Sequence, residues 1–234
     1  MHRACMRSPV IAAIFALTLA SSAAYAQNPP TEWDGLVRVN SRNFDAVYLA
    51  PGADFSGYTK VMLDPTEVAF RRNWLRDFNR TAIGLSNRIS DDEARRILDA
   101  VQTGFQDVFT QAYRESGFEV VTTPGPDVLR LRTAVTDLDI AAPDTMTPGR
   151  RRTFGTEAGQ ATVVIEARDS MSGAILGRGV DRQTAGDNSF MLQRNRVTNR
   201  ADFGRVFRRW ADLSVQALQR LRETPAPAAP PTGE

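Results

Sequence analysis

The chain has 234 residues, with 29 Lys and Arg against 27 Asp and Glu, one histidine and one cysteine. This length fits one domain with a substantial hydrophobic core. A formal net charge of +2 gives no support to a nucleic-acid partner, because nucleic-acid-binding domains carry a large local excess of Lys and Arg.

The N-terminus has the pattern of a secretory signal peptide. His2, Arg3 and Arg7 give a positive start, residues 10–20 are apolar apart from one threonine, and small alanines flank residue 25. Such a pattern predicts cleavage after Ala26. A membrane anchor is the alternative, but a span needs about 20 apolar residues, roughly twice this run. We therefore expect a periplasmic protein without a transmembrane segment.

Cleavage would remove the only histidine, His2, and the only cysteine, Cys5. Without Arg3 and Arg7, 27 Lys and Arg remain against 27 Asp and Glu. A Ser-His-Asp triad, a Cys–His pair and a His or Cys zinc site are then excluded. Cys5 precedes the apolar run, so we expect no lipid anchor on an N-terminal cysteine. We expect no cofactor and no metal, and any catalysis would need carboxylates, tyrosines, arginines or Lys60.

Two long amphipathic helices are predicted. In the first, Ser90 and Glu93 form a capping box, apolar residues recur at helical spacing from residue 97 to 112, and Gly117 ends the helix. The second covers about residues 200–222, with an apolar stripe that includes Phe203, Phe207 and Trp210. Both stripes fit a helix lying on a sheet.

Predicted strands surround the first helix. They cover residues 46–50, 59–64, 66–70, 118–122, 128–140, 161–169 and 174–183, and the last two form a hairpin. The pattern predicts an α+β fold, a single mostly antiparallel sheet with two amphipathic helices packed on one face. We expect one domain over residues 27–223 and a disordered Pro- and Ala-rich tail over residues 224–234. Irregular stretches at 71–89, 141–160 and 184–198 are the expected places for a site.

Two arginine-rich stretches are candidate binding sites for an anionic partner. In residues 71–80 arginines alternate with aromatic residues, so Arg71, Arg72 and Trp74 could contact such a ligand. The alternative is a short amphipathic turn in which Trp74 and Phe78 pack on the body of the domain. The run of Arg150, Arg151 and Arg152 could bind a lipid headgroup or a polysaccharide, or it could be a solvated loop.

Two further patterns could indicate chemistry. Asp137 and Asp139 are spaced to point the same way on a strand and could form an acid–base pair, although the polar end of a strand also explains them. Gly177 and Gly179 resemble half of a nucleotide fingerprint, but the third glycine is missing and the segment lies in a hairpin. We therefore reject nucleotide binding.

The densest local motif lies in residues 48–65. It combines a Pro-Gly turn, an aspartate that can bind its own following backbone, and a strand stopped by Asp-Pro. Its expected structural residues are Pro51, Gly52, Asp54, Tyr58, Lys60, Asp64 and Pro65.

These residues resemble the bacterial exported family known as domain of unknown function 3313. The resemblance covers roughly residues 33–221 and is most specific within residues 51–65. It implies a Gram-negative cell-envelope protein without an assigned activity, so it implies no catalytic residues. The resemblance implies lipoprotein-like relatives, and this chain differs from such members by lacking the lipidation cysteine.

The main hypothesis is a non-catalytic periplasmic protein that binds an envelope partner, which could be a protein, a polysaccharide or a lipid. One alternative is a carboxylate-dependent hydrolase of cell-wall or polysaccharide material, which needs two acids in one cleft. Another is a carrier of a small molecule or lipid, which needs an internal apolar cavity of roughly a few hundred Å³.

Overall fold

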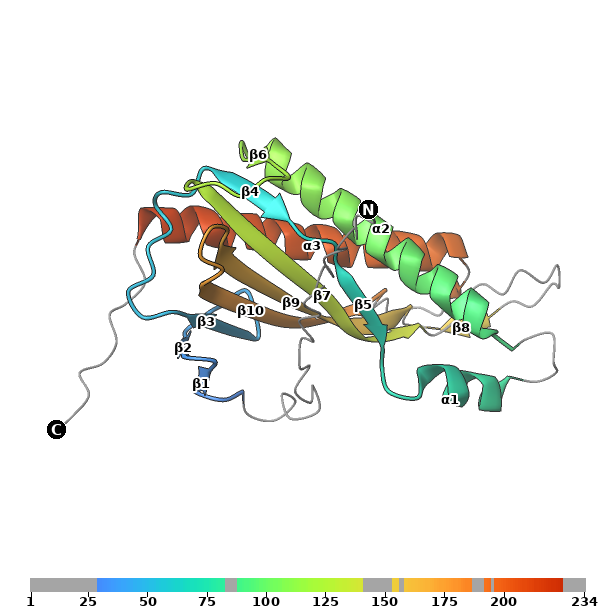
Figure 1. Cartoon of the computed structure of the whole chain (residues 1–234). Helices are drawn as coiled ribbons and strands as arrows, with labels where there is room; N and C mark the ends of the chain where they lie inside the picture. Colours follow the sequence, from blue (N-terminus) through green and yellow to red (C-terminus); the bar gives the residue numbers. More distant parts are fainter. Residues whose placement is uncertain are drawn as a thin grey trace, which may run out of the picture.

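A computed structural model describes residues 29–82, 88–140, 153–155, 158–186, 192–194 and 196–224. The expected signal peptide, Arg150, Arg151, Arg152 and all of the expected tail except Thr224 lie outside the described residues. The described part is dominated by one nine-stranded sheet (Figure 1). Its strands are β1 (Glu32–Trp33), β2 (Leu36–Val39), β3 (Ala46–Leu49), β4 (Lys60–Leu63), β5 (Glu67–Phe70), β6 (Glu119–Val120), β7 (Val128–Ile140), β9 (Gly159–Asp169) and β10 (Ile175–Ala185).

The predicted α+β class and the mostly antiparallel sheet are confirmed. The strand order is β1-β2-β3-β10-β9-β7-β4-β6, and the pairs from β1 to β7 are all antiparallel. The last part of the sheet is parallel, because β4 and β5 both run alongside β7, and β6 pairs with β4. A separate two-stranded sheet joins β8 (Thr153–Gly155) to β11 (Leu192–Arg194).

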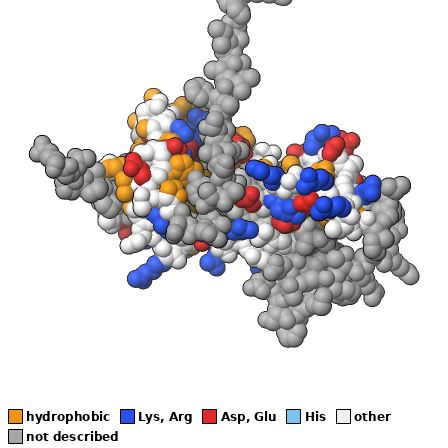
Figure 2. All heavy atoms as spheres, turned by 90° about the horizontal axis from the view of Figure 1, so that it is seen from below, with side chains coloured by type: hydrophobic (Ala, Val, Ile, Leu, Met, Phe, Trp, Pro, Cys, Tyr) orange, Lys and Arg blue, Asp and Glu red, His pale blue; other side chains and the backbone are white. Residues whose placement is uncertain are grey.

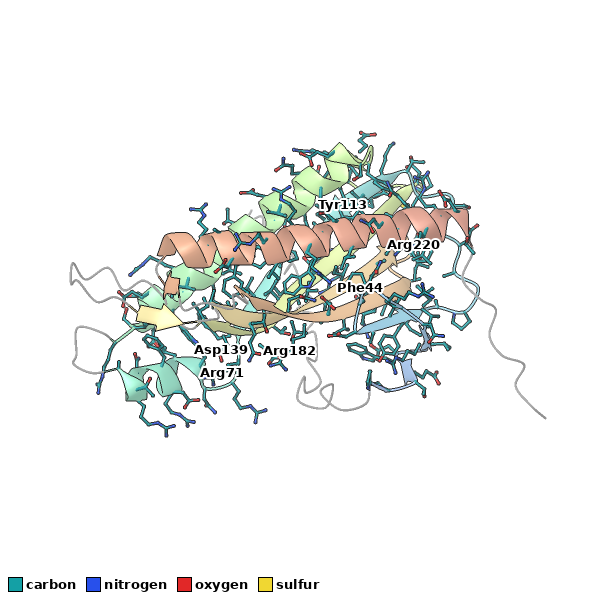
Figure 3. The ribbon with its side chains drawn as sticks, turned by 180° about the vertical axis from the view of Figure 1, so that it is seen from behind. Phe44, Arg71, Tyr113, Asp139, Arg182 and Arg220 are labelled. Carbon is teal, nitrogen blue, oxygen red and sulfur yellow. The ribbon has the colours of Figure 1, made fainter. Side chains whose placement is uncertain are left out.

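The structure has three helices in its described part, one more than predicted. They are α1 (Trp74–Thr81), α2 (Asp91–Glu115) and α3 (Arg196–Glu223). Helices α2 and α3 lie across the sheet beside one another (Figures 1 and 3). The additional helix, α1, falls in residues 71–89, which the sequence predicts to be irregular.

Local sequence signals fix the ends of α2. The Ser90 hydroxyl accepts a hydrogen bond from the Glu93 backbone N–H, and the Glu93 carboxylate accepts one from the Ser90 backbone N–H. At the other end, Gly117 has a φ of +86°. The backbone N–H groups of Gly117 and Phe118 donate to the carbonyls of Arg114 and Tyr113, the arrangement that closes a helix with glycine in the left-handed region.

Aromatic side chains from α2 and α3 form the centre of the core. Phe105 and Phe109 stack with ring centroids 4.1 Å apart, and Phe207 meets Phe105 edge-on at 5.4 Å. Apolar side chains of β7 and β9 complete this cluster. The buried Tyr113 and Ser214 hydroxyls are 2.6 Å apart, so a hydrogen bond also joins the two helices.

A bulge in β7 changes which side chains face the core. Asp137 has a φ of +50°, and the register against β9 shifts between Thr136 and Asp139. Val135, Leu138 and Ile140 are therefore all buried in the core, although strict alternation would turn the last two away. Because of the bulge, Asp139 lies on the face of the sheet opposite the helices.

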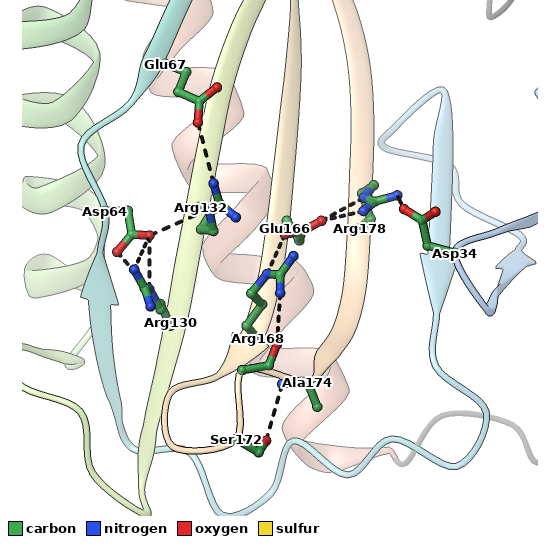
Figure 4. Close-up of polar contacts among 11 residues, drawn as sticks. Asp34, Asp64, Glu67, Arg130, Arg132, Glu166, Arg168, Ser172, Ala174 and Arg178 are labelled. Atoms are coloured by element: carbon green, nitrogen blue, oxygen red, sulfur yellow. Dashed lines mark hydrogen bonds and ion pairs between the residues drawn. The ribbon is translucent and has the colours of Figure 1, made fainter. Parts of the chain in front are cut away.

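That opposite face carries a network of ion pairs (Figure 4). Arg178, on β10, donates to Glu166 on β9 and, at 2.8 Å, to Asp34. Burial alone would raise the pKa of Glu166, but hydrogen bonds from Arg178 and Arg168 outweigh it and lower the pKa. Arg178 therefore neutralises a carboxylate on each side of its own strand. A second group of pairs joins Arg130 and Arg132 to Asp64 and Glu67.

Candidate functional site

Helix α1 is held to the end of the sheet by three stacked aromatic rings. The Trp74 ring lies 3.9 Å from Phe70, which ends β5, and 5.7 Å from Phe78, one turn further along α1. Trp74 is only 2% exposed. Stacking of this kind fixes the orientation of a helix that, at eight residues, is too short to be stable alone.

Arg71 fastens α1 to β7 by charge (Figure 3). Its Nε donates to Asp139 Oδ2 at 2.6 Å, and its Nη1 donates to Asp77 Oδ2 at 3.1 Å. The hydrogen bond to Asp139 is the main reason why the pKa of Arg71 is raised, and the hydrogen bond from Arg71 is the main reason why the pKa of Asp77 is lowered. Arg71 is therefore occupied by two carboxylates from two elements.

Asn79 connects α1 to the chain that enters α2. Its Nδ2 donates to the Ile89 carbonyl at 2.8 Å, and its Oδ1 accepts from the Ile89 backbone N–H at 2.7 Å. Ile89 is buried in the core. Helix α1 is thus anchored at its start by Arg71 and Trp74 and near its end by Asn79.

Three exposed arginines lie on and beside α1, namely Arg76 and Arg80 within the helix and Arg72 just before it, and we call them the α1 arginine face. Arg72 is exposed, and the side chains of Arg76 and Arg80 are 69% and 76% exposed. Arg76 and Arg80 share one carboxylate, Asp77, at 3.4 and 3.8 Å. Figure 2 shows Lys and Arg side chains gathered on the side of the molecule where α1 lies.

The charges around α1 are unbalanced, in contrast to the paired groups around Arg178 and Arg130 on the sheet. Four guanidinium groups, those of Arg71 and of the α1 arginine face, meet only Asp77 and Asp139 among the described residues. Exposed pairs at 3.4–3.8 Å are weak, so a ligand can displace them at little cost. The arrangement can bind carboxylate, phosphate or sulfate groups, for which the planar guanidinium is well suited.

The structure separates the three residues that the sequence groups together. Arg72 is exposed, Arg71 is held by Asp139 and Asp77, and Trp74 is buried in the stack. The sequence-based site did not include Arg76 and Arg80, although both lie in the same run. Their spacing of four residues was the signal that could have identified them.

The turn at the start of the 51–65 motif shapes the chain between β3 and β4. Gly52 follows Pro51 with a φ of +70°, and the Ala53 backbone N–H donates to the Ala50 carbonyl at 3.0 Å. The Asp54 carboxylate accepts from the Ser56 backbone N–H at 2.8 Å, which lowers the pKa of Asp54. These contacts hold the chain in a tight turn between β3 and β4.

The rest of the motif ties β4 to neighbouring strands and turns. Tyr58 donates to Asp169 at 2.8 Å, and burial followed by this hydrogen bond raises the pKa of Tyr58 to about 12. Lys60 pairs with Asp127 at 3.2 Å. Asp64, directly before Pro65, accepts from Arg130 at 2.9 Å.

The geometry gives little support to the two alternative functions. Asp139 is engaged by Arg71, and the bulge at Asp137 breaks the alternation that would align the two carboxylates. Among the described residues, no group of three or more His, Cys, Asp and Glu side chains is placed to hold a metal ion. An apolar pocket between α3 and the sheet has a volume of about 80 Å³, well below the few hundred Å³ that carriers need.

One buried carboxylate was not predicted. Asp181, on β10, is 3% exposed and accepts from Trp210 Nε1 at 2.8 Å and from Gln183 Nε2 at 2.7 Å. Burial raises the pKa of Asp181, and the charge of Asp45 adds a smaller effect in the same direction. Trp210 was predicted as a core residue only, because a sequence pattern does not show which polar group an indole N–H meets.

None of the helices in the described part of the chain is long and apolar enough to cross a membrane. No curated protein matches the chain. Among solved structures, PelC of Paraburkholderia phytofirmans, which forms a dodecamer, is 14% identical with a TM-score of 0.39, over 74% of this chain and 96% of PelC. Protein XCC0632 of Xanthomonas campestris is 10% identical with a TM-score of 0.36, over 71% of this chain and 86% of that protein.

A minor lipoprotein from Acinetobacter baumannii is 12% identical with a TM-score of 0.29, over 74% of this chain and 98% of the lipoprotein. Likenesses this low identify no function. In contrast, the family model described as "Protein of unknown function (DUF3313)" matches residues 26–214, which include α1, α2, most of α3 and the whole nine-stranded sheet. The chain therefore belongs to the DUF3313 family of proteins of unknown function.

Proposed function

We propose that this protein is a non-catalytic module of the cell envelope that binds an anionic partner through the α1 arginine face. The observation that carries the proposal is the contrast between α1 and the rest of the sheet. Arg130, Arg168 and Arg178 on the sheet each pair with a carboxylate. In contrast, Arg76 and Arg80 on α1, and Arg72 just before it, are exposed on an element that the Trp74 stack and Arg71 hold in place. Exposed arginines without a full set of partners contribute little to folding stability, so their fixed position is better explained by ligand binding.

The chemistry of the described residues supports binding over turnover. The acids that the sequence offered as a catalytic pair are separated in role, since Asp139 neutralises Arg71 and Asp137 forms the bulge. Asp181, the acid with a raised pKa, is buried against Trp210 in the core and is too little exposed to contact a ligand at the surface.

The proposal is tested by sedimenting isolated cell envelopes with purified protein that starts at Gln27, the expected mature N-terminus. We expect the wild type to sediment with the envelopes at low salt and to be released as salt rises. The variant R72E/R76E/R80E should remain in the supernatant. The control R208E/R209E/R220E changes the net charge equally at exposed positions of α3 and should sediment like the wild type.

Two results would overturn the proposal. One is equal sedimentation of both triple variants, which would mean that net charge and not α1 decides binding. The other is steady turnover of a glycan, a peptide or a phosphoester by the purified protein. Circular dichroism of each variant shows whether it is folded before it is compared.

A further inference from the structure

The α1 arginine face has no apolar component. Trp74 is buried, and Leu75 and Phe78 pack against the core, so the exposed residues on and just before α1 are all polar: Arg72, Asn73, Arg76, Arg80 and Thr81. Among the described residues, the one strongly exposed large hydrophobic side chain is Met171, which lies in the turn between β9 and β10. The β9–β10 turn and α1 are at opposite ends of β7 (Figure 1).

This composition argues against a bilayer as the ligand of α1. Stable attachment of a helix to a membrane surface combines electrostatic attraction with burial of an apolar face among the lipids. Here the apolar residues of α1 already pack against the protein, Trp74 fully buried and Leu75 and Phe78 partly buried. Three arginines alone would give weak attachment that salt readily reverses.

A folded protein partner is also a poor match. The central part of a specific protein interface is depleted of charge and enriched in aromatic and other apolar side chains. Every aromatic side chain of α1 lies on its inner side, so a protein docked on α1 would have only a charged rim. A ligand that binds by charge alone, at several points along a line, fits this surface better.

The two arginines within α1 form a short row along the helix. Arg76 and Arg80 are one helical turn apart, with Cβ atoms about 5–6 Å from one another, and α1 itself is about 12 Å long. The row continues onto the sheet through Arg71 and Asp139, because Asp139 is paired across the strands with Gln160, and Gln160 accepts a hydrogen bond of 2.8 Å from the exposed Arg182. Figure 3 shows Arg71, Asp139 and Arg182 in this sequence.

We infer that the anionic partner is a linear acidic polysaccharide, whose carboxylates lie along Arg72, Arg76 and Arg80 and which continues toward Arg182. The inference rests on the proposed function and adds the class of the ligand. A flexible polymer with regularly spaced carboxylates can meet each guanidinium in turn, and each contact is a charge-assisted hydrogen bond. Trp74 is buried and stacks between Phe70 and Phe78, neither of which is exposed. The α1 surface therefore presents no exposed ring for stacking with a neutral sugar, so recognition depends on the acid groups.

The test measures binding of purified protein to polygalacturonate, a linear polymer of carboxylated sugars, by biolayer interferometry. Neutral dextran and vesicles with one third anionic phospholipid are measured in parallel. We expect binding to polygalacturonate that weakens steeply with salt, and no binding to dextran. R72Q/R76Q/R80Q should bind about tenfold more weakly or worse, and R182Q about twofold to threefold more weakly. The control R208Q/R209Q/R220Q should bind like the wild type.

Each outcome decides the inference. Arginine-dependent binding to the vesicles without binding to polygalacturonate would overturn the polysaccharide class while leaving an anion-binding α1. Equal weakening by the two triple variants would overturn both the inference and the proposed function, because it would show that the overall positive charge, and not α1, decides binding. Both would also be overturned if the wild type bound none of the anionic probes at low salt.

Discussion

Gly177, Arg178 and Gly179 are three consecutive residues of β10 that alternate between the two faces of the sheet. The two glycines face the helices, where Phe55 and Phe44 lie against them, while Arg178 faces the other way and pairs with Glu166. Arg178 also lies over the Trp33 ring, 3.9 Å from its centroid. The glycines of this segment, which partly match a nucleotide fingerprint, are therefore explained by close packing.

The two glycines should respond differently to alanine. A Cβ at position 179 would lie 3.5 Å from the Phe44 ring, in ordinary contact, whereas a Cβ at 177 would lie 2.9 Å from Leu49 Cδ2 and 3.3 Å from the Tyr48 carbonyl. Gly179→Ala should stabilise the protein by about 0.5–1 kcal/mol. Gly177→Ala should destabilise it by about 1–3 kcal/mol. Urea unfolding measures both, and shifts in the same direction would refute this packing argument.

Asp181 should make the protein less stable as pH rises, which is the reverse of the usual effect of an aspartate. Its raised pKa, caused first by burial, means that the folded state holds the proton more tightly than the unfolded state. The stabilisation is therefore complete below the unfolded pKa of about 4 and is lost as pH rises through the folded pKa.

Comparison with Asp181→Asn isolates this effect. Acids with lowered pKa values, such as Asp77 and Asp169, change stability with pH in the opposite direction, but they are present in both proteins and cancel in the difference. The free energy of unfolding of the variant minus that of the wild type should rise as the pH rises above about 4. Urea unfolding at several pH values gives this difference. A constant difference would show that Asp181 titrates normally.

At the scale of elements, the sequence predicts what local signals encode. Helix α2 combines a capping box, 25 residues of regular spacing and a closing glycine, so its bounds follow closely from the pattern. Helix α1 falls in a stretch expected to be irregular, but the alternative interpretation of a short amphipathic turn, with Trp74 and Phe78 packed on the body, agrees with the structure. The full eight-residue helix was not predicted, because it also depends on stacking against Phe70, which belongs to another element. The β1–β2 hairpin was also missed, although Asp34 and Gly35, with φ values of +53° and +77°, are typical of a two-residue turn.

The candidate site was predictable only in part for the same reason. Composition identifies residues 71–80 as arginine-rich and aromatic, but Asn73 takes a left-handed conformation with a φ of +63° and resets the helical phase after Arg72. Which arginines point outward therefore depends on where α1 begins. The bulge at Asp137, which brings Asp139 to Arg71, has no signal in the sequence.

Arg71 should hold α1 in place without supporting the rest of the fold. In Arg71→Gln the contacts to Asp139 and Asp77 are lost, while the core cluster is unchanged. Hydrogen–deuterium exchange of residues 74–81 should become several-fold faster, and the free energy of unfolding should fall by no more than about 1 kcal/mol, because the pair is partly exposed. Arg76→Gln is the control and should leave exchange unchanged. Unaltered exchange in Arg71→Gln would show that the Trp74 stack suffices.

At the scale of the whole molecule, the sheet divides two tasks. Its helix-covered face buries the aromatic core of α2 and α3, which gives the domain its stability. Its other face carries paired charges and, at the end of β5 and β7, positions α1 and its exposed arginines. Binding at α1 therefore need not disturb the core.

The central claim is that the α1 arginine face contacts the envelope partner, and guanidinium labelling tests it most directly. Phenylglyoxal modifies exposed arginines, and peptide mass spectrometry reports the labelling rate of each one. Isolated envelopes should slow the labelling of Arg72, Arg76 and Arg80 several-fold while Arg208, Arg209 and Arg220 react at an unchanged rate. Equal labelling of the two groups, with the protein bound to the envelopes, would contradict the claim.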